Sequence, residues 1–309
     1  MSAEAGLASA GPFARLEAPV RGALLMVGAC AGFAGMMAIV RKVSPEIHPF
    51  EAAFFRTALG VVFMLPWLVR AGLAPLRTGR PGMHLLRAVF GIVAMLLLFT
   101  SLGLLPLADV TALSFSAPLF ATLGAALILR ERVGRRRWAA TLIGLLGALI
   151  ILRPGHEAFS GAALLALASA AGIAAAQLSV KALSRTEDPN AMVLIMCVLM
   201  TAMALGPALV VWAWPTWTGF AWLLLMGLVA TFGQICLVHA MAAADASAIM
   251  PFDFSRLIFA SALGWLMFGE VPDRWTWVGA AIIVASTVYI ARREAKIARE
   301  RKLVLLPEA

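Results

Sequence analysis

Charged side chains are scarce in this sequence: Asp, Glu, Lys and Arg make up 13% of its 309 residues, whereas hydrophobic residues make up 62%. A soluble domain of this length needs far less apolar surface to build its core. The low charge content therefore excludes a soluble globular protein and indicates a membrane protein.

Enzyme and metal-site motifs are also missing. The chain has no glycine-rich phosphate loop, no HExxH and no GxSxG, so we expect neither an enzyme nor an ATP-driven mechanism, and no cofactor. Cys30, Cys197 and Cys236 lie inside apolar runs without the paired spacing of a metal site or a disulfide framework, and we interpret them as packing residues. An intramembrane enzyme or a passive scaffold is the alternative class.

The charge that is present is mostly positive, with 25 Lys and Arg against 16 Asp and Glu and a formal net charge of +9. These basic residues stand in short segments between apolar runs. Orientation in a membrane explains that placement better than nucleic-acid binding, which needs a basic patch on a soluble fold.

Apolar runs long enough to cross a bilayer as helices recur along the chain, at about 20 residues each. We predict ten spans, over 22–40, 50–69, 83–104, 107–129, 138–152, 161–180, 191–212, 220–241, 244–268 and 275–291. The first run leads into Arg41 and Lys42 rather than a small-residue cleavage site, so it is predicted to be a span and not a signal peptide.

The basic residues also predict how these spans are oriented. With the N-terminus inside, the inner connections and tails hold eighteen Lys and Arg and the outer ones four, while the remaining three of the 25 lie within spans. Both termini are therefore expected in the cytoplasm, with the chain in a cell membrane.

The second half of the sequence repeats the first. Glu131 and Glu270 are 139 residues apart, as are Trp138 and Trp277, and each pair follows an acidic residue and a proline in the same order. This repetition predicts two units of five spans each. Because five is an odd number, the second unit must have the opposite orientation in the membrane to the first. We therefore predict a cytoplasmic segment (1–21), a first repeat (22–152), a second repeat (161–291) and a basic tail (292–309).

Two further segments carry expectations about packing and membrane contact. Gly28 and Gly32 have a small-xxx-small spacing that favours close helix packing, with a substrate route along this face as the alternative. The tail over 292–306 is basic and partly amphipathic, and is expected to lie on the anionic inner leaflet or to remain disordered.

Charged side chains within the spans are the first candidates for function, because burying them in lipid is costly. Asp253 and Arg256 are three residues apart and share a helix face, and Arg56 lies toward the same side of the membrane. The three are expected to form one cluster. It is either a structural ion pair or a site where an arginine receives the carboxylate or other anionic group of a substrate.

Prolines interrupt the fourth and ninth predicted spans. Pro118 and Pro251 each remove one helical hydrogen bond, which leaves a backbone carbonyl free. Interruptions at corresponding places in two repeats point to a transport site, although a plain kink is the simpler alternative. The expected pathway here also includes Phe252, and Ser114, Ser116 and Ser255 can add polar contacts.

Other polar residues have more ordinary explanations. Gln177 and His239 are either interhelical hydrogen-bonding partners or pathway residues. Asp109 and Asp245 are predicted to cap helices at the interface. Glu131 and Glu270 lie at opposite faces of the membrane and can close salt bridges with loop arginines as gates, with ordinary interfacial pairing as the alternative.

Taken together, these motifs resemble the EamA family of the drug/metabolite transporter superfamily. The resemblance covers nearly the whole chain and rests on the doubled five-span unit, on FFRTALG around Arg56, on SAPLFATLGAALILRER from Ser116, and on PFDFSRLIFASALGWLMFGE from Pro251 to Glu270. The first copy departs from the pattern in having RER where the second has FGE.

The resemblance implies a ten-helix bundle with a central cavity, which moves solutes by alternating access and is driven by gradients or exchange. Members carry amino acids, vitamins, nucleotide-like cofactors and other metabolites. From this we expect export of an amino acid or a similar compound. The alternative is uptake of a vitamin or cofactor such as riboflavin or S-adenosylmethionine. The expected partners are the metabolite, the lipid bilayer, and protons or a counter-substrate.

Overall fold

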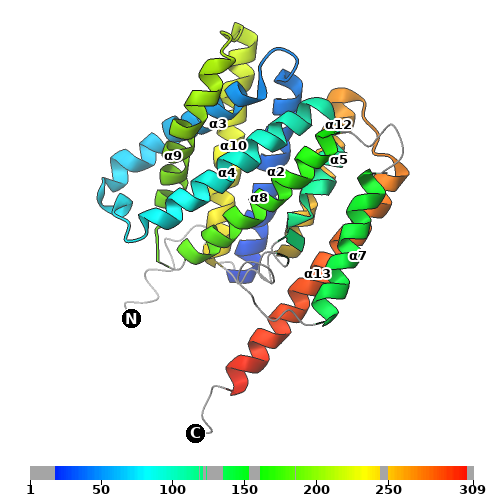
Figure 1. Cartoon of the computed structure of the whole chain (residues 1–309). Coiled ribbons are helices and arrows are strands. Elements are labelled where there is room, and N and C mark those ends of the chain that lie inside the picture. Colours follow the sequence, from blue (N-terminus) through cyan, green and yellow to red (C-terminus); the bar gives the residue numbers. More distant parts are fainter. Residues whose placement is uncertain are drawn as a thin grey trace.

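The computed structural model describes residues 18–117, 119–120, 123, 135–152, 161–184, 186–243 and 250–304. Throughout these ranges every regular element is a helix (Figure 1). The predicted all-helical class is therefore confirmed.

The helices follow one another along the chain in a simple order. They are α2 (Ala18–Val43), α3 (Pro49–Ala71), η2 (Ala74–Leu76), α4 (Pro81–Leu104), α5 (Leu107–Ser114), α7 (Arg135–Leu152), α8 (Gly161–Leu183), α9 (Pro189–Val210), α10 (Trp217–Ala243), η3 (Met250–Phe254), α12 (Ser255–Phe268) and α13 (Arg274–Val304). Six of those described, α2, α3, α4, α8, α9 and α10, are long and apolar enough to cross a membrane, as a multi-pass membrane protein requires. The other four predicted spans stay predictions.

Helices α3 and α9 begin in the same way. Each opens with a proline, Pro49 or Pro189, at a position where the missing backbone N–H leaves no hydrogen bond unmade. The residue before it caps the helix: His48 Nδ1 accepts from a first-turn amide at 3.2 Å, and Asp188 Oδ1 accepts from two at 2.9 Å. Local chemistry therefore fixes where both helices start.

The main helix pairs join different halves of the chain. Helix α2 packs most extensively against α10, and α4 against α8, while α3 lies beside α9 and α7 beside α13 (Figure 1). Exchanging the two predicted repeats turns the α2–α10 pair into the α8–α4 pair. The same exchange leaves the α3–α9 and α7–α13 pairs unchanged. The interior is therefore shared between the halves.

Glycines bring these helices into backbone contact. A Cβ on Gly32 of α2 would lie 2.7 Å from the Val229 carbonyl oxygen and 2.9 Å from Gly233 Cα of α10. On α8, a Cβ on Gly172 would lie 2.9 Å from Ala94 Cβ of α4. The small-residue face predicted around Gly32 thus serves close helix packing.

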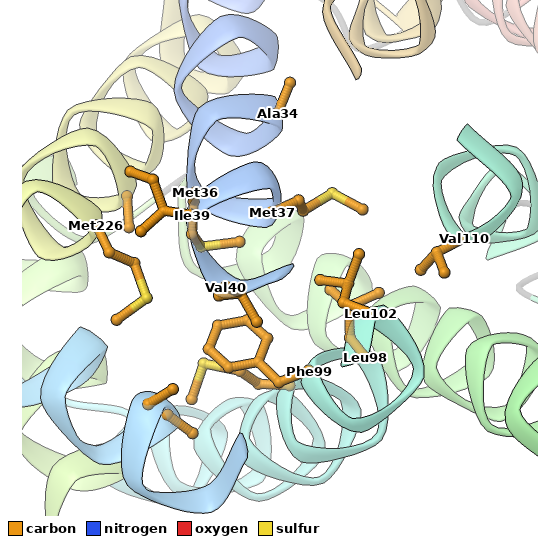
Figure 2. Packing of buried hydrophobic residues seen from close by; sticks show 14 of the residues in the cluster. Ala34, Met36, Met37, Ile39, Val40, Leu98, Phe99, Leu102, Val110 and Met226 are labelled. Atoms are coloured by element: carbon orange, nitrogen blue, oxygen red, sulfur yellow. The ribbon is translucent and has the colours of Figure 1, made fainter. Parts of the chain in front are cut away.

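Large apolar side chains fill the space around these crossings. Figure 2 shows Val40 of α2 beside Phe99 of α4, with Met37 of α2 on one side and Met226 of α10 on the other, and all four are fully or almost fully buried. Apolar residues also point outward: Val69, for example, is 83% exposed. An apolar exterior of this kind suits contact with lipid tails.

The described residues near both prolines depart from regular α-helix. Helix α5 ends at Ser114, and Phe115 and Ser116 form a turn just before Pro118, which itself lies outside the described residues. In the second half, residues Met250–Phe254 form the 3-10 helix η3, which includes Pro251 and precedes α12. The described backbone next to each proline is thus a turn or a 3-10 helix, as expected where a helical hydrogen bond is missing.

The basic tail is helical for most of its length. Helix α13 runs without a break from Arg274 to Val304, and its far end lies at the same end of the bundle as the start of α2 (Figure 1). Alanine, arginine, glutamate and lysine dominate this stretch and favour a helix. Residues 292–304 are therefore helical, and their contact with the inner leaflet stays a prediction.

Candidate functional site

A cavity of about 170 Å³ lies at the centre of the bundle, among seven helices from both halves of the chain. Helices α2, α3 and α4 contribute from the first half, and α8, α9, α10 and α12 from the second. Its polar wall consists of Arg56, Arg87, Gln177, Gln234 and Arg256. No described residue that lines it is an aspartate or a glutamate.

Arg56 projects from the second turn of α3 and is only 7% exposed. Its Nε is buried without a hydrogen-bond partner, and the side chain makes no hydrogen bond or ion pair with another described residue. A guanidinium has five N–H donors, so Arg56 presents unused donors to the cavity.

Arg87 of α4 is 2% exposed and is held by neutral groups of α9. Its Nη1 donates to the Met192 carbonyl oxygen at 2.9 Å, and its Nη2 lies 3.4 Å from Met196 Sδ. Arg87 is also close enough to Arg56 for the two charges to repel each other. These contacts orient the side chain without neutralising it.

Arg256 joins the two interrupted spans. Its Nη2 lies 3.2 Å from Asp253 Oδ2, which makes it the one cavity arginine paired with a carboxylate among the described residues. Its guanidinium carbon lies 5.3 Å from the centre of the Phe115 ring, and that ring packs edge-on against Phe254 with centroids 5.2 Å apart. The break after α5 and the break in η3 therefore meet beside the cavity.

The rest of the wall is soft and apolar. Five methionines line the cavity together with two phenylalanines, namely Met36, Met37, Met95, Met196, Met200, Phe33 and Phe99. Methionine is flexible and polarizable, so it adapts to ligands of irregular shape and contacts aromatic rings favourably. The site can therefore hold an apolar or aromatic body next to polar groups.

Two amides complete the polar wall. Gln177 of α8 and Gln234 of α10 face the cavity, and neither side chain bonds to another described residue. Each amide offers both donors and an acceptor. They can therefore recognise a ligand edge that carries both kinds of group.

A cluster around Glu270 links several helix ends on one side of the bundle, and we refer to it as the Arg41–Glu270 latch. Arg41 at the end of α2 forms an ion pair with Glu270, and it also donates to the Leu105 and Leu102 carbonyl oxygens, the latter at 2.9 Å. Glu270 Oε2 accepts from the Leu107 amide at 3.0 Å. The latch thus joins the ends of α2, α4 and α12 to the start of α5.

The remaining predicted site residues fall into three groups. Asp253 reaches the cavity only through Arg256, and its Oδ1 lies 3.6 Å from the Cys30 thiol. Ser116 is fully buried, and its hydroxyl has no hydrogen-bond partner among the described residues. Phe252 is 43% exposed, and His239 bonds at 2.9 Å to the Ile235 carbonyl of its own helix, so neither lines the cavity.

Three residues with predicted roles lie outside the part of the chain that the structure describes, namely Pro118, Glu131 and Asp245. Two polar cavity residues, Arg87 and Gln234, were not among the predicted site residues. Arg87 carried the same signal as Arg56, a charge within a predicted span, but had no motif around it. Gln234 carried no separate signal, because α10 is apolar on every side.

Comparisons with known proteins agree with this picture. The model of the EamA-like transporter family matches twice, over residues 20–153 and 160–292. A riboflavin transporter of Vibrio cholerae is 38% identical over 92% of this chain and 97% of its own length. An S-adenosylmethionine uptake transporter of Rickettsia bellii is 30% identical over 83% of this chain and 88% of its own length.

Two further matches extend the set. A pseudopaline exporter of Pseudomonas aeruginosa is 31% identical over 88% of this chain and 96% of its own. One solved crystal structure has a TM-score of 0.61 at 19% identity, over 86% of this chain and 97% of its own, which shows a common fold alone. With a family model that matches both halves and named transporters as relatives, this chain belongs to the EamA-like transporter family and is a small-molecule transporter, not an enzyme.

Proposed function

We propose that this protein carries riboflavin, or a closely related flavin, into the cell across a bacterial inner membrane. Riboflavin joins an apolar dimethylbenzene ring to an edge rich in carbonyl acceptors and to a chain of hydroxyl groups. The methionine and phenylalanine wall suits the ring, while the arginines and the two glutamines suit the polar edge. The cavity with both kinds of wall is the observation that carries the proposal, and the riboflavin transporter relative supports it.

S-adenosylmethionine is a poorer substrate for this site. Its sulfonium and ammonium groups outweigh its single carboxylate, so the molecule is a net cation at neutral pH. Three arginines on the wall and no described carboxylate facing the cavity repel such a charge.

Export of an amino-acid-like compound is the second candidate. A guanidinium binds a carboxylate well, and Arg56 has donors that no described residue uses. The named exporter among the relatives supports this direction of transport. Flux measurements decide between the two candidates.

The transport mechanism we propose is alternating access between two inverted five-helix repeats, with ten spans in all. The exchange of helix pairs between halves, α2 with α10 and α8 with α4, supports a two-fold relation within the membrane plane. The Arg41–Glu270 latch then serves as the outer gate in its closed state, and Glu131 is its inner counterpart. With both termini in the cytoplasm, the latch faces outward.

Purified protein in proteoliposomes tests the proposal directly. We expect uptake of radiolabelled riboflavin by vesicles that contain the protein. Replacing Arg56 by Gln should reduce that uptake about tenfold or more, as expected when hydrogen bonds from a charged donor are lost. Arg70→Gln is a matched control, because Arg70 is exposed at the other end of the same helix. Amino-acid flux without flavin flux would make export the function.

A further inference from the structure

The cavity has an unbalanced positive charge. Arg56, Arg87 and Arg256 all line it, and Asp253 is the one described carboxylate that forms an ion pair with any of them. Arg56 and Arg87 are more than nine-tenths buried and contact neutral groups where they contact any. Two guanidinium charges thus face a small space without a described counter-charge.

Buried charges of this kind are normally paired. Removing an ion from water carries a large penalty in a medium of low dielectric constant, and a hydrogen-bonded partner of opposite charge offsets it. The donors of Arg56 that no described residue uses, in a cavity open to solutes during transport, therefore indicate a negatively charged ligand rather than a structural role.

The surroundings of Arg87 fit the same role. Its contacts to the Met192 carbonyl oxygen and to Met196 Sδ hold the guanidinium against α9 from one side. Arg56 interacts with it electrostatically from α3. Planar forks of N–H donors on two helices match the geometry of an oxyanion and bind it better than a single point charge does.

We propose that Arg56 and Arg87 bind an anionic group in the central cavity while the methionine wall holds the apolar part of the substrate. The group is either a phosphate or carboxylate of the transported molecule, or a small inorganic anion that accompanies a neutral flavin. The inference deepens the proposed function, because it concerns the charge of what the same site carries.

Ligand-induced thermal stabilisation of the purified full-length protein tests the inference. The probes are sodium chloride, inorganic phosphate, riboflavin and riboflavin 5′-phosphate, in a buffer whose only other anion is a bulky sulfonate. At least one anionic probe should raise the melting temperature of the wild type. Arg56→Gln or Arg87→Gln should weaken its binding about 10- to 100-fold, as when a charged hydrogen-bond donor is lost.

Lysine variants guard against a trivial failure to fold. Arg56→Lys and Arg87→Lys keep the charge but lose the fork, so they should bind the anion more weakly than the wild type and more tightly than the glutamine variants. Arg70→Gln should bind like the wild type. The inference is overturned if no anion stabilises the wild type, or if all variants respond equally.

The pattern of binding identifies the source of the anion. If the substrate supplies it, riboflavin 5′-phosphate binds more tightly than riboflavin, and inorganic phosphate competes. If a small anion accompanies the substrate, riboflavin binds more tightly as chloride or phosphate is added. Flavin flux with no anion dependence would sink this inference and leave the proposed function standing. Anion binding with no flavin flux would overturn the proposed function and leave this inference standing.

Discussion

Gly32 is a single residue on which the contact between α2 and α10 depends. Its missing side chain lets the two backbones touch, since an added Cβ would lie 2.7 Å from the Val229 carbonyl oxygen. We predict that Gly32→Ala forces the helices apart and lowers the free energy of unfolding by about 1–3 kcal/mol, the usual cost of overpacking. Thermal unfolding in detergent measures the effect.

Gly35 on the same helix provides the control. A Cβ there would meet only Val229 Cγ2, at 3.9 Å, which is an ordinary contact. Gly35→Ala should therefore melt at or above the wild-type temperature. Equal losses in the two variants would show that the close approach at Gly32 does not set the stability.

Arg256 and Asp253 are predicted to act as a unit. Arg256→Gln removes a cavity donor and the contact with the Phe115 ring, while Asp253→Asn leaves the arginine without its carboxylate. Each single variant should lose flux while the protein still inserts in the membrane. The double variant should lose no more than the worse single one, with a coupling of roughly 0.5–3 kcal/mol for residues in contact.

The double-mutant cycle is measured as initial flux in proteoliposomes at matched protein density. Strictly additive losses would mean that the two residues act separately. Unchanged flux in Arg256→Gln would remove Arg256 from the substrate site altogether.

Sequence reasoning reached some cavity residues and not others for a physical reason. Arg56 and Arg256 stand out because charge in lipid needs an explanation, and both line the cavity, as Gln177 does. Arg87 satisfied the same rule and was passed over. His239 and Gln234 share an apolar helix, so no pattern of polar residues shows which of them faces inward.

At the scale of elements, the Arg41–Glu270 latch joins four helix ends. Glu270→Gln removes the ion pair and leaves Arg41 among backbone carbonyls. A hydrogen bond between charged groups contributes about 1.5–3 kcal/mol, so its loss should shift the balance toward an outward-open state by about tenfold or more. We predict faster access to the cavity from outside.

Labelling of a single cysteine measures that access. With Cys30, Cys197 and Cys236 replaced, Met37→Cys places one thiol on the cavity wall. A membrane-impermeant maleimide should modify it faster in the Glu270→Gln background. Glu46→Gln is the control, because Glu46 is an exposed glutamate in the connection after α2. Equal labelling rates in all backgrounds would remove the latch as a gate.

The sequence predicts where the two proline-bearing spans depart from regular α-helix, but not the backbone geometry found there. Proline cannot donate the hydrogen bond that a continuous helix needs, and this rule placed an interruption near Pro251. It could not tell that Met250–Phe254 adopts 3-10 geometry, or that Phe115 and Phe254 bring the two breaks together. Contacts between distant segments depend on packing, which local sequence does not record.

At the scale of the whole molecule, the inverted repeat makes a topological prediction. A cysteine placed in the connection between α7 and α8 should react with an impermeant maleimide added outside the cell. A cysteine placed after Val304 should react only once the membrane is opened. Labelling of both from the same side would remove the inversion, and alternating access between inverted halves with it.

The global pattern was the most predictable part of the molecule. Six of the ten predicted spans overlap α2, α3, α4, α8, α9 and α10, because hydropathy reports directly on burial in lipid. The pairing of α2 with α10 and of α4 with α8 did not follow from the sequence. The small-residue spacing of Gly28 and Gly32 indicated close packing but not the partner helix.

That pairing has a consequence for how the polypeptide can be divided. The backbones of α2 and α10 are in contact, and those of α4 and α8 nearly so. Each half of the sequence therefore makes its closest helix contacts with the other half. A fragment ending near Leu152 therefore exposes the packing surfaces of α2 and α4 that α10 and α8 cover in the full chain. When this fragment is co-expressed with the rest of the chain, the two fragments should associate and form the native bundle without a peptide bond between them.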